Sequence, residues 1–257
     1  MRKLALSCSG LLALLLLWDA AVRAGTASLL PGPWAVARAI VHMAASGLLV
    51  KHLVASLFRV TWGYLAAVVL ALPLGIFLGT HRRTELALGP FFELLRPISP
   101  VAWIPISILW LGVGDLAAVA IILLASFLPL TLAVKNAVGG IPLIHLHVGE
   151  NFGLGPRALV RKVIFPAILP QVIVGLRLTL GIAWLVVVAA EMIAATSGLG
   201  FLIIDARNAG NRYDLVIAGM VLIGLVGLSL DFMVRRLERL PALRWGYADG
   251  AGREGTS

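Results

Sequence analysis

Long runs of apolar residues, separated by short polar stretches, dominate the pattern of this chain. A transmembrane α-helix needs about 20 consecutive apolar residues, and these runs lack the period-two alternation of barrel strands. The pattern therefore predicts an all-α polytopic membrane protein with about six transmembrane helices, of which the third is short and crosses only with its flanks. The runs lie near Leu4–Val22, Ser56–Gly79, Val101–Gly114, Leu116–Val134, Val172–Ala195 and Leu215–Val234.

Polar and turn-forming residues between these runs predict the first connections. An amphipathic stretch, Trp34–Leu49, follows Leu30-Pro31-Gly32-Pro33 and is expected to lie along the outer interface. The sequence Gly112-Val113-Gly114-Asp115 predicts a tight outer turn between the third and fourth runs.

Three prolines, Pro97, Pro100 and Pro105, open the third run. Proline removes a backbone donor and disfavours helix in the residue before it. Irregular backbone is tolerated at membrane depth where protein or a watery cavity satisfies it. Two interpretations stay open, a plain packing kink or a bend that lines a pathway; the second makes Pro100, Trp103 and Pro105 candidate pathway residues.

The connection between the fourth and fifth runs is about 36 residues long and lies on the predicted cytoplasmic side. Pro142 suits a first helical position. Ile144, Val148 and Phe152 follow at i, i+4 and i+8, which places one apolar stripe on a short helix. Gly153 is a good helix stop, so the pattern predicts a short helix that ends in a glycine elbow.

A second, basic helix is predicted after this elbow. Pro156 can start it, and Leu159 and Val163 then share one face. Pro166 and Pro170 are expected to break the chain before it re-enters the membrane. The basic side chains that point elsewhere are Arg157, Arg161 and Lys162. From periodicity alone, a hairpin that lies on lipid headgroups fits as well as a protruding one.

Composition supports the membrane interpretation. The 257 residues are 60% hydrophobic and 13% charged, with a mean hydropathy of +1.01. A soluble domain usually carries about a quarter of charged residues, so a water-soluble protein is excluded. The single cysteine, Cys8, excludes an internal disulfide. Lipidation at Cys8 and signal cleavage near Val22-Arg23-Ala24 are less favoured than a retained first helix.

The positive-inside rule explains the net charge of +9 better than nucleic-acid binding does. With the N-terminus in the cytoplasm, 14 basic residues fall in cytoplasmic segments and 6 in outer segments, and both termini are cytoplasmic. The cytoplasmic set is Arg2, Lys3, Arg82, Arg83, Arg96, Lys135, Arg157, Arg161, Lys162, Arg235, Arg236, Arg239, Arg244 and Arg253. The outer set is Arg23, Arg38, Lys51, Arg59, Arg207 and Arg212.

Few charged residues fall inside the predicted spans. Glu191 lies deep in the fifth, where a charge is costly unless hydrated or paired, so it either lines the translocation path or makes a structural hydrogen bond between helices. Arg177 is expected to snorkel to the inner interface, and Arg59, near the outer face, is expected to be solvated. Asp231 and Arg235 form an i, i+4 pair.

Polar residues also follow the fifth span. Ser197-Gly198-Leu199-Gly200 is predicted to be a flexible outer turn. The charged residues after it are expected to be solvated or to dock a partner protein; they are Asp205, Arg207, Arg212 and Asp214, with Asn208 among them.

Motifs for enzymatic chemistry do not occur in the sequence. No G-x-x-x-x-G-K-[ST] stretch is present, so the chain cannot bind ATP by that route. His145 and His147 stand at i, i+2 and do not share a helix face, which argues against a metal site. The chain is therefore not expected to be an enzyme or to hold a cofactor or metal.

The loop between the fourth and fifth runs resembles the "EAA" motif of permease subunits of ABC-type importers. Gly153, Ile164-Phe165-Pro166 and Leu169-Pro170 match it, whereas His147, followed by Val148 and Gly149, stands where the motif has glutamate. The departure puts the glutamate's particular polar contact in doubt, not the shape of the loop. The stretches LLPGP, RPISPVAWIPISILWLGVGD, GLRLTLGIAWLVVVAAEMIAATSGLGFLI and RRLERLPALRW are similar to permeases for alkanesulfonates, taurine, nitrate and bicarbonate.

The resemblance implies a single transmembrane permease domain over residues 1–257 with the type I (MetI-like) architecture. Its core would span about 50–236, its cytoplasmic coupling loop about 136–170, and a cytoplasmic tail 237–257, disordered from Asp249. The first loop helix would be the coupling helix that inserts into a separate ATPase. The coupling residues implied are His147, Val148, Gly149, Phe152, Gly153, Leu154 and Pro166.

The resemblance also implies the partners. They are a second copy of the chain, a cytoplasmic ATPase dimer that holds ATP and Mg²⁺, a periplasmic or lipid-anchored solute-binding protein, and membrane lipid, with no nucleic acid. The protein would lie in the bacterial inner membrane and import a small oxyanion, organosulfonates first and nitrate or bicarbonate next. The rival hypotheses are a secondary transporter or channel driven by an ion gradient, which predicts acidic or histidine relays, and a scaffold without transport.

Overall fold

The computed structural model describes residues 2–25 and 30–238, and they are helical with no strand among them. This confirms the all-α prediction. The expected disorder of the tail from Asp249 lies outside the described residues. The helices are α1 (Arg2–Arg23), α2 (Pro33–Ala45), α3 (Leu48–Thr80), α4 (Arg82–Leu95), α5 (Ile104–Leu111), α6 (Asp115–Gly139), α7 (Leu143–Asn151), α8 (Pro156–Leu159), α9 (Phe165–Ala194), α10 (Leu199–Asn208) and α11 (Tyr213–Glu238). A 3₁₀ turn η1 (Pro100–Trp103) precedes α5, and a π-helical turn η2 (Val160–Ile164) joins α8 to α9.

Helices long and apolar enough to cross a membrane agree roughly with the predicted count of six. Four are found among the described residues, at Leu48–Thr80, Asp115–Gly139, Pro156–Ala194 and Tyr213–Arg236. A fifth is present if α4 and the Pro100–Leu111 segment count as one span, although the two are bent by 86° at the prolines. The range of the first expected span forms α1.

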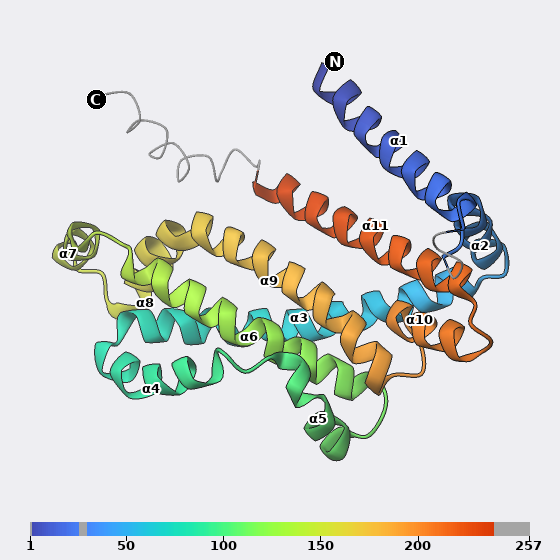
Figure 1. Cartoon of the computed structure of the whole chain (residues 1–257). Helices are drawn as coiled ribbons and strands as arrows, with labels where there is room; N and C mark the ends of the chain where they lie inside the picture. Colours follow the sequence, from blue (N-terminus) through green and yellow to red (C-terminus); the bar gives the residue numbers. More distant parts are fainter. Residues whose placement is uncertain (1, 26–29, 239–257) are drawn as a thin grey trace.

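The bundle is organised lengthwise (Figure 1). The spanning helices run side by side; α2 and α10 lie together at one end, and α4, α7 and α8 lie at the other. The bent α4–α5 segment returns the chain to the end where α3 begins, so α3 and α6 run parallel, with Gly63 against Ile122 and Gly75 against Val134. The α7 end is the predicted cytoplasmic end.

The closest helix pair is α3 against α6, and small residues explain it. Gly63, Ala67, Ala71, Gly75 and Gly79 recur every fourth position, which places them on one face of α3. A Cβ atom at Gly75 would lie 2.6 Å from Val134 Cβ, and one at Gly63 would lie 2.8 Å from Ile122 Cβ. The stripe therefore lets the α6 backbone approach closely, as small-residue stripes do between membrane helices.

The second span and the segment before it differ from the prediction. The amphipathic stretch Trp34–Leu49 ends at Ala45, and α3 begins at Leu48 rather than near Ser56. Val36, Ala39 and Met43 are buried against α10 and α11, so α2 packs on protein as well as facing outward. The helix extends beyond the predicted start at Ser56 because the polar side chain of His52 is satisfied inside the bundle, where its Nδ1 accepts from Gly198 N–H.

Pro166 and Pro170 do not break the chain, contrary to the prediction. Pro166 falls in the first turn of α9 and Pro170 inside it, and Pro156–Ala194 is one continuous helical span. The π turn explains this: Phe165 N–H donates to Val160 O, five residues back, so the hydrogen-bond register is already shifted where Pro166 lacks a donor. Pro142 is the N-cap of α7 rather than its first residue.

Candidate functional site

A buried ion pair joins α3 and α9 at the end of the bundle opposite α7, which is the predicted outer end. Arg59 is 1% exposed and Glu191 is 0% exposed. Arg59 Nη1 donates to Glu191 Oε1 at 2.7 Å. A charge removed from water at this depth is stable only when it is paired and hydrogen-bonded, and here each charge supplies the partner that the other needs.

The same guanidinium binds the two turns that flank it. Arg59 Nε donates to Asp115 Oδ1 at 2.7 Å, at the first residue of α6. Arg59 Nη1 also donates to the carbonyl of Ser197 at 2.7 Å, and Nη2 donates to Ser197 Oγ at 2.6 Å. Asp115 is largely exposed, so the cluster reaches the surface on that side.

Glu191 is the second centre of this cluster, which we call the outer network (His52, Ser56, Arg59, Asp115, Glu191 and Ser197–Gly200). Ser56 Oγ donates to Glu191 Oε2 at 2.9 Å, and Gly200 N–H donates to the same oxygen at 3.0 Å. Leu199 N–H donates to Ser56 Oγ at 2.9 Å, and Gly198 N–H donates to His52 Nδ1 at 3.0 Å. Side chains of α3 and α9 therefore bind the free N–H groups that begin α10.

Glycine is required where the α9–α10 turn meets the carboxylate. Gly198 has φ +108°, a conformation that side chains rarely adopt, and a Cβ atom there would overlap the Glu191 carboxylate. A Cβ atom at Gly200 would overlap the carbonyl oxygen of Val188. The predicted flexible turn is thus held on several sides by the outer network.

The outer network corrects the prediction for Arg59 and shows the contacts of Glu191. Arg59 is not solvated near the outer face but is the most connected member of the network. Glu191 makes structural hydrogen bonds between helices and lines none of the cavities described below. Its assignment to the path stays a prediction. One feature of the sequence could have identified the Arg59–Glu191 pair. The two residues carry opposite charges and lie at similar distances from the same end of the second and fifth apolar runs.

The loop at the opposite end has the predicted shape. α7 is followed by Gly153 with φ +73°, and Gly153 N–H donates to Glu150 O at 2.8 Å. Pro156 begins α8 as predicted. The apolar stripe faces outward: Ile144, Val148 and Phe152 are exposed, Phe152 by 84%.

The inner face of α7 holds the loop to the bundle. Gly149 is buried, and a Cβ atom there would lie 2.6 Å from Leu159 Cδ1. Leu154 N–H donates to Gly149 O at 3.1 Å, and Leu146 packs on the inner core cluster. A small residue at position 149 therefore fixes α7 against α8, while exposed His147 has its side chain on the surface.

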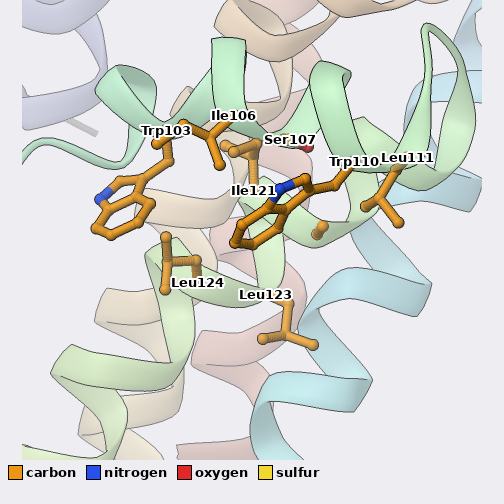
Figure 2. Close-up of a pocket in the computed structure, with 9 residues that line it drawn as sticks. Trp103, Ile106, Ser107, Trp110, Leu111, Ile121, Leu123 and Leu124 are labelled. Carbon is orange, nitrogen blue, oxygen red and sulfur yellow. The ribbon is translucent and has the colours of Figure 1, made fainter.

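The candidate pathway residues are not gathered in one cavity. Trp103 lines a cavity of about 240 Å³ between α5 and α6, where Figure 2 shows its indole ring near that of Trp110. Pro100 lines a neighbouring cavity of about 200 Å³. Pro105 and Glu191 line neither of them.

Two further ion pairs clarify the remaining charges. Arg177 Nε donates to Asp231 Oδ1 at 2.7 Å, which joins α9 to α11, and Arg235 Nε donates to Asp231 Oδ2 at 2.8 Å, as predicted for that pair. Arg177 is therefore paired rather than only snorkelling. Arg212 binds Asp214 in the outer polar stretch, and this carboxylate raises the pKa of the Arg212 guanidinium above its usual value.

Metal binding has no geometric support in the described part of the chain. No three of its histidine, cysteine, aspartate and glutamate residues gather as a metal-binding group. His145 and His147 are both exposed on α7.

The sequence is similar to transport proteins over most of its length. A family model described as a binding-protein-dependent transport system inner membrane component matches residues 71–241. A protein of Bacillus subtilis assigned to aliphatic sulfonate transport is 36% identical over 220 residues, which are 86% of this chain and 79% of that protein. The taurine transport system permease of Escherichia coli K12 is 32% identical over 247 residues, 93% of this chain and 89% of that one.

A nitrate import permease and a solved structure extend these similarities. The nitrate permease of a Synechocystis species is 35% identical over 186 residues, 72% of this chain and 67% of that protein. The inward-facing MetNI methionine ABC transporter contains a chain that superposes with a TM-score of 0.67 at 21% identity, covering 75% of this chain and 95% of that one. At that identity the structural match concerns the fold.

Proposed function

Since the chain belongs to the family of binding-protein-dependent transport system inner membrane components, we propose that it moves a small oxyanion across the inner membrane, with aliphatic sulfonates and taurine first and nitrate or bicarbonate next. The family establishes the general role. The chain is a multi-span ABC importer permease of the inner membrane and not an enzyme, and this family implies a partner ATPase and a solute-binding protein.

The coupling role is proposed for α7 and its elbow. The observation that carries it is an exposed apolar stripe, Ile144, Val148 and Phe152, on a helix whose other face is fixed to the bundle. An exposed apolar patch on a protruding element is typical of a docking surface. The partner ATPase would bind ATP and Mg²⁺ and hold this helix in a groove, and this subunit would hold no cofactor.

Alternating access follows from that contact. Closure of two ATPase subunits on ATP would draw the coupling helices of two permease copies together, and hydrolysis would let them separate. α7 packs on α8 at Gly149, and α8 continues into α9 in the Pro156–Ala194 helix, so a displacement of α7 would be transmitted along α9 toward the outer network.

The proposed orientation places both termini, α4 and α7 in the cytoplasm. The distribution of basic residues, 14 against 6, supports it. α2 and α10 lie together at the other end (Figure 1), where the solute-binding protein would dock. The exposed Arg212, just before α11, and the partly buried Asp214 in the first turn of α11 are candidates for that contact.

The solute class is supported by relatives that agree on an oxyanion. The aliphatic sulfonate and taurine relatives align over 86% and 93% of this chain, against 72% for the nitrate relative, although the identities are nearly equal. The longer aligned share of the chain therefore favours organosulfonates as the solute, whereas the sequence identities do not distinguish them from nitrate. A stand-alone ion-coupled transporter is disfavoured, because Glu191 is closed within the outer network rather than placed in a relay.

The experiment is uptake into proteoliposomes by the permease reconstituted with its partner ATPase and solute-binding protein. We expect ethanesulfonate and taurine to accumulate only when ATP and Mg²⁺ are supplied on the ATPase side. Uphill uptake by the permease alone would contradict the assignment. Uptake of nitrate or bicarbonate without uptake of any sulfonate would keep the transport role and replace the first solute class.

A further inference from the structure

Three cavities lie in succession along α6. The outer cavity, about 240 Å³, lies against α5, the middle one is about 200 Å³, and the inner one, about 400 Å³, lies against α4. Their α6 lining recurs at helical spacing and consists of Ala120, Ile121, Leu123, Leu124, Ala125, Leu128, Pro129, Leu132, Ala133, Lys135 and Asn136. The bent α4–α5 segment forms the opposite wall.

Shared residues join these cavities into one groove, which we call the α6 groove. Leu124 lines both the outer and the middle cavity. Arg96, Pro129 and Leu132 line both the middle and the inner cavity. At 1.5 Å per residue, the stretch from Ala120 to Asn136 covers about 24 Å, most of a hydrocarbon core of about 30 Å.

Polar groups on the α6 groove are mostly hydrogen-bond donors. Trp103 and Trp110 in the outer cavity carry indole N–H groups, which donate only, and Arg96 carries a guanidinium, which also donates only. The hydroxyl of Ser107 is not available as a donor to a solute, because its Oγ donates to Ala117 O at 3.0 Å. Lys135 in the inner cavity is partly neutralised by Glu85, at 3.0 Å. The outer cavity is almost wholly apolar, and the inner cavity adds the carboxylate of Glu93 and the amide of Asn136 to these donors, so a preference for anions depends on the charge of Arg96.

Arg96 is the cation best placed to act on a solute. It is exposed at the junction of the middle and inner cavities, and the ion pairs recorded among the described residues include none for its guanidinium. Glu93 is the acidic residue in the same cavity, one helical turn before Arg96 on α4, and it limits the positive potential there.

We propose that Arg96 is the charge-selecting residue of the α6 groove, where its guanidinium attracts an anion in transit between the tryptophan-lined outer cavity and the cytoplasm. The inference deepens the proposed function, on whose anionic solute it rests, by naming the residue that selects the charge. A guanidinium beside the groove acts on a passing charge at short range, whereas an arginine elsewhere on the surface acts over a longer distance that salt screens.

The test measures local charge selectivity without any assumption about the natural solute. Cys8 is replaced by serine, and Asn136→Cys, in the same cavity as Arg96, serves as the reporter in the full complex with ATPase and binding protein. The rates of modification by an anionic and a cationic methanethiosulfonate of similar size are compared. We expect Arg96→Gln to lower the anionic-to-cationic rate ratio about threefold to tenfold, because one full charge is lost at short range. Arg96→Lys should keep most of the ratio.

Arg83→Gln is the matched control, because Arg83 is an exposed arginine of the same helix that lines none of the three cavities. An unchanged ratio in Arg96→Gln, or an equal fall in Arg83→Gln, overturns the proposal. Failure of both reagents to reach Asn136→Cys overturns it too, since the groove would then be closed to ions.

Uptake separates this proposal from the proposed function. If the unmodified complex accumulates ethanesulfonate, Arg96→Gln should raise the KM for its uptake several-fold, and an unchanged KM overturns the role of Arg96. If the complex accumulates none of the oxyanions while the reagent ratio still depends on Arg96, the solute assignment fails and the selecting role stands.

Discussion

Arg59 Nη1 and Glu191 Oε1 lie 2.7 Å apart inside the bundle, although 132 positions separate the two residues in the sequence. Both side chains are closed to solvent. The pair joins the second and fifth apolar runs at the end where α9 turns into α10. It therefore converts two costly charges into a connection that fixes the α9–α10 turn on α3.

Breaking this pair from one side should be more harmful than removing it altogether. Arg59→Ala leaves Glu191 buried without its cation, which should cost about 3–5 kcal/mol of unfolding free energy. The double replacement Arg59→Met with Glu191→Leu should cost clearly less than the sum of the single replacements. Denaturant unfolding of the purified protein in detergent measures both.

Arg38→Ala is the control for this cycle, because Arg38 is an exposed arginine of α2 and should change stability by no more than about 0.5 kcal/mol. Additive costs in the double mutant, within error, would show that Arg59 and Glu191 do not depend on one another.

Two glycines with similar φ angles give a second prediction. Gly198 lies in the α9–α10 turn, and Gly210 follows α10. Gly198 and Gly210 have φ of +108° and +115°, but a Cβ atom would overlap the Glu191 carboxylate at Gly198 and would meet nothing within 4 Å at Gly210. Gly198→Ala should therefore lower the free energy of unfolding by about 1–3 kcal/mol more than Gly210→Ala does. Both variants strain the backbone, but only Gly198→Ala also overpacks its surroundings. Thermal unfolding and ATP-driven uptake measure the difference. Equal losses would mean that backbone strain alone requires these glycines.

Sequence reasoning identified the features that depend on local pattern. The apolar runs, the turn at Gly112–Asp115, the elbow at Gly153 and the helix that begins at Pro156 each depend on a few neighbouring residues. Helix period, glycine conformation and proline geometry act over that range, so a single sequence contains the necessary information.

Features that depend on distant contacts were missed. Arg59 was read as solvated because its partners Asp115, Glu191 and Ser197 are 56 to 138 positions away. Pro166 was read as a break because nothing in the local sequence announces the π turn that accommodates it. Ser56 and Arg59 stand at i, i+3 on α3, and that shared face was the available sign that this polar surface binds something inside the bundle.

The small-residue stripe of α3 supplies a third prediction. The leucine side chain in Gly75→Leu should clash with Val134 and with the carbonyl of Thr131 on α6. This overpacking should lower the free energy of unfolding by at least about 1–3 kcal/mol. Gly181→Leu is the matched change, because Gly181 also lies in a spanning helix and a Cβ atom there meets nothing within 4 Å. The fraction of monodisperse protein after detergent extraction measures the effect. Equal recovery of both variants would contradict close α3–α6 packing at Gly75.

The loop at the α7 end of the bundle supplies the last prediction. Gly153 has φ +73° and its N–H binds Glu150 O at 2.8 Å, whereas proline requires φ near −65° and has no N–H. Gly153→Pro should therefore leave the protein inserted in the membrane but reduce solute-stimulated ATP turnover by at least about tenfold, because α7 would be displaced from the ATPase groove.

Gly155→Pro is the control, because Gly155 already has φ −66° and a Cβ atom there meets nothing within 4 Å. This variant should keep most of the stimulated turnover. ATP hydrolysis by the reconstituted complex, with and without the solute-loaded binding protein, measures both variants. Turnover at the unmodified level in Gly153→Pro would remove the coupling role from α7, and equal loss in the two variants would show that the loop tolerates no proline rather than that the elbow positions the helix.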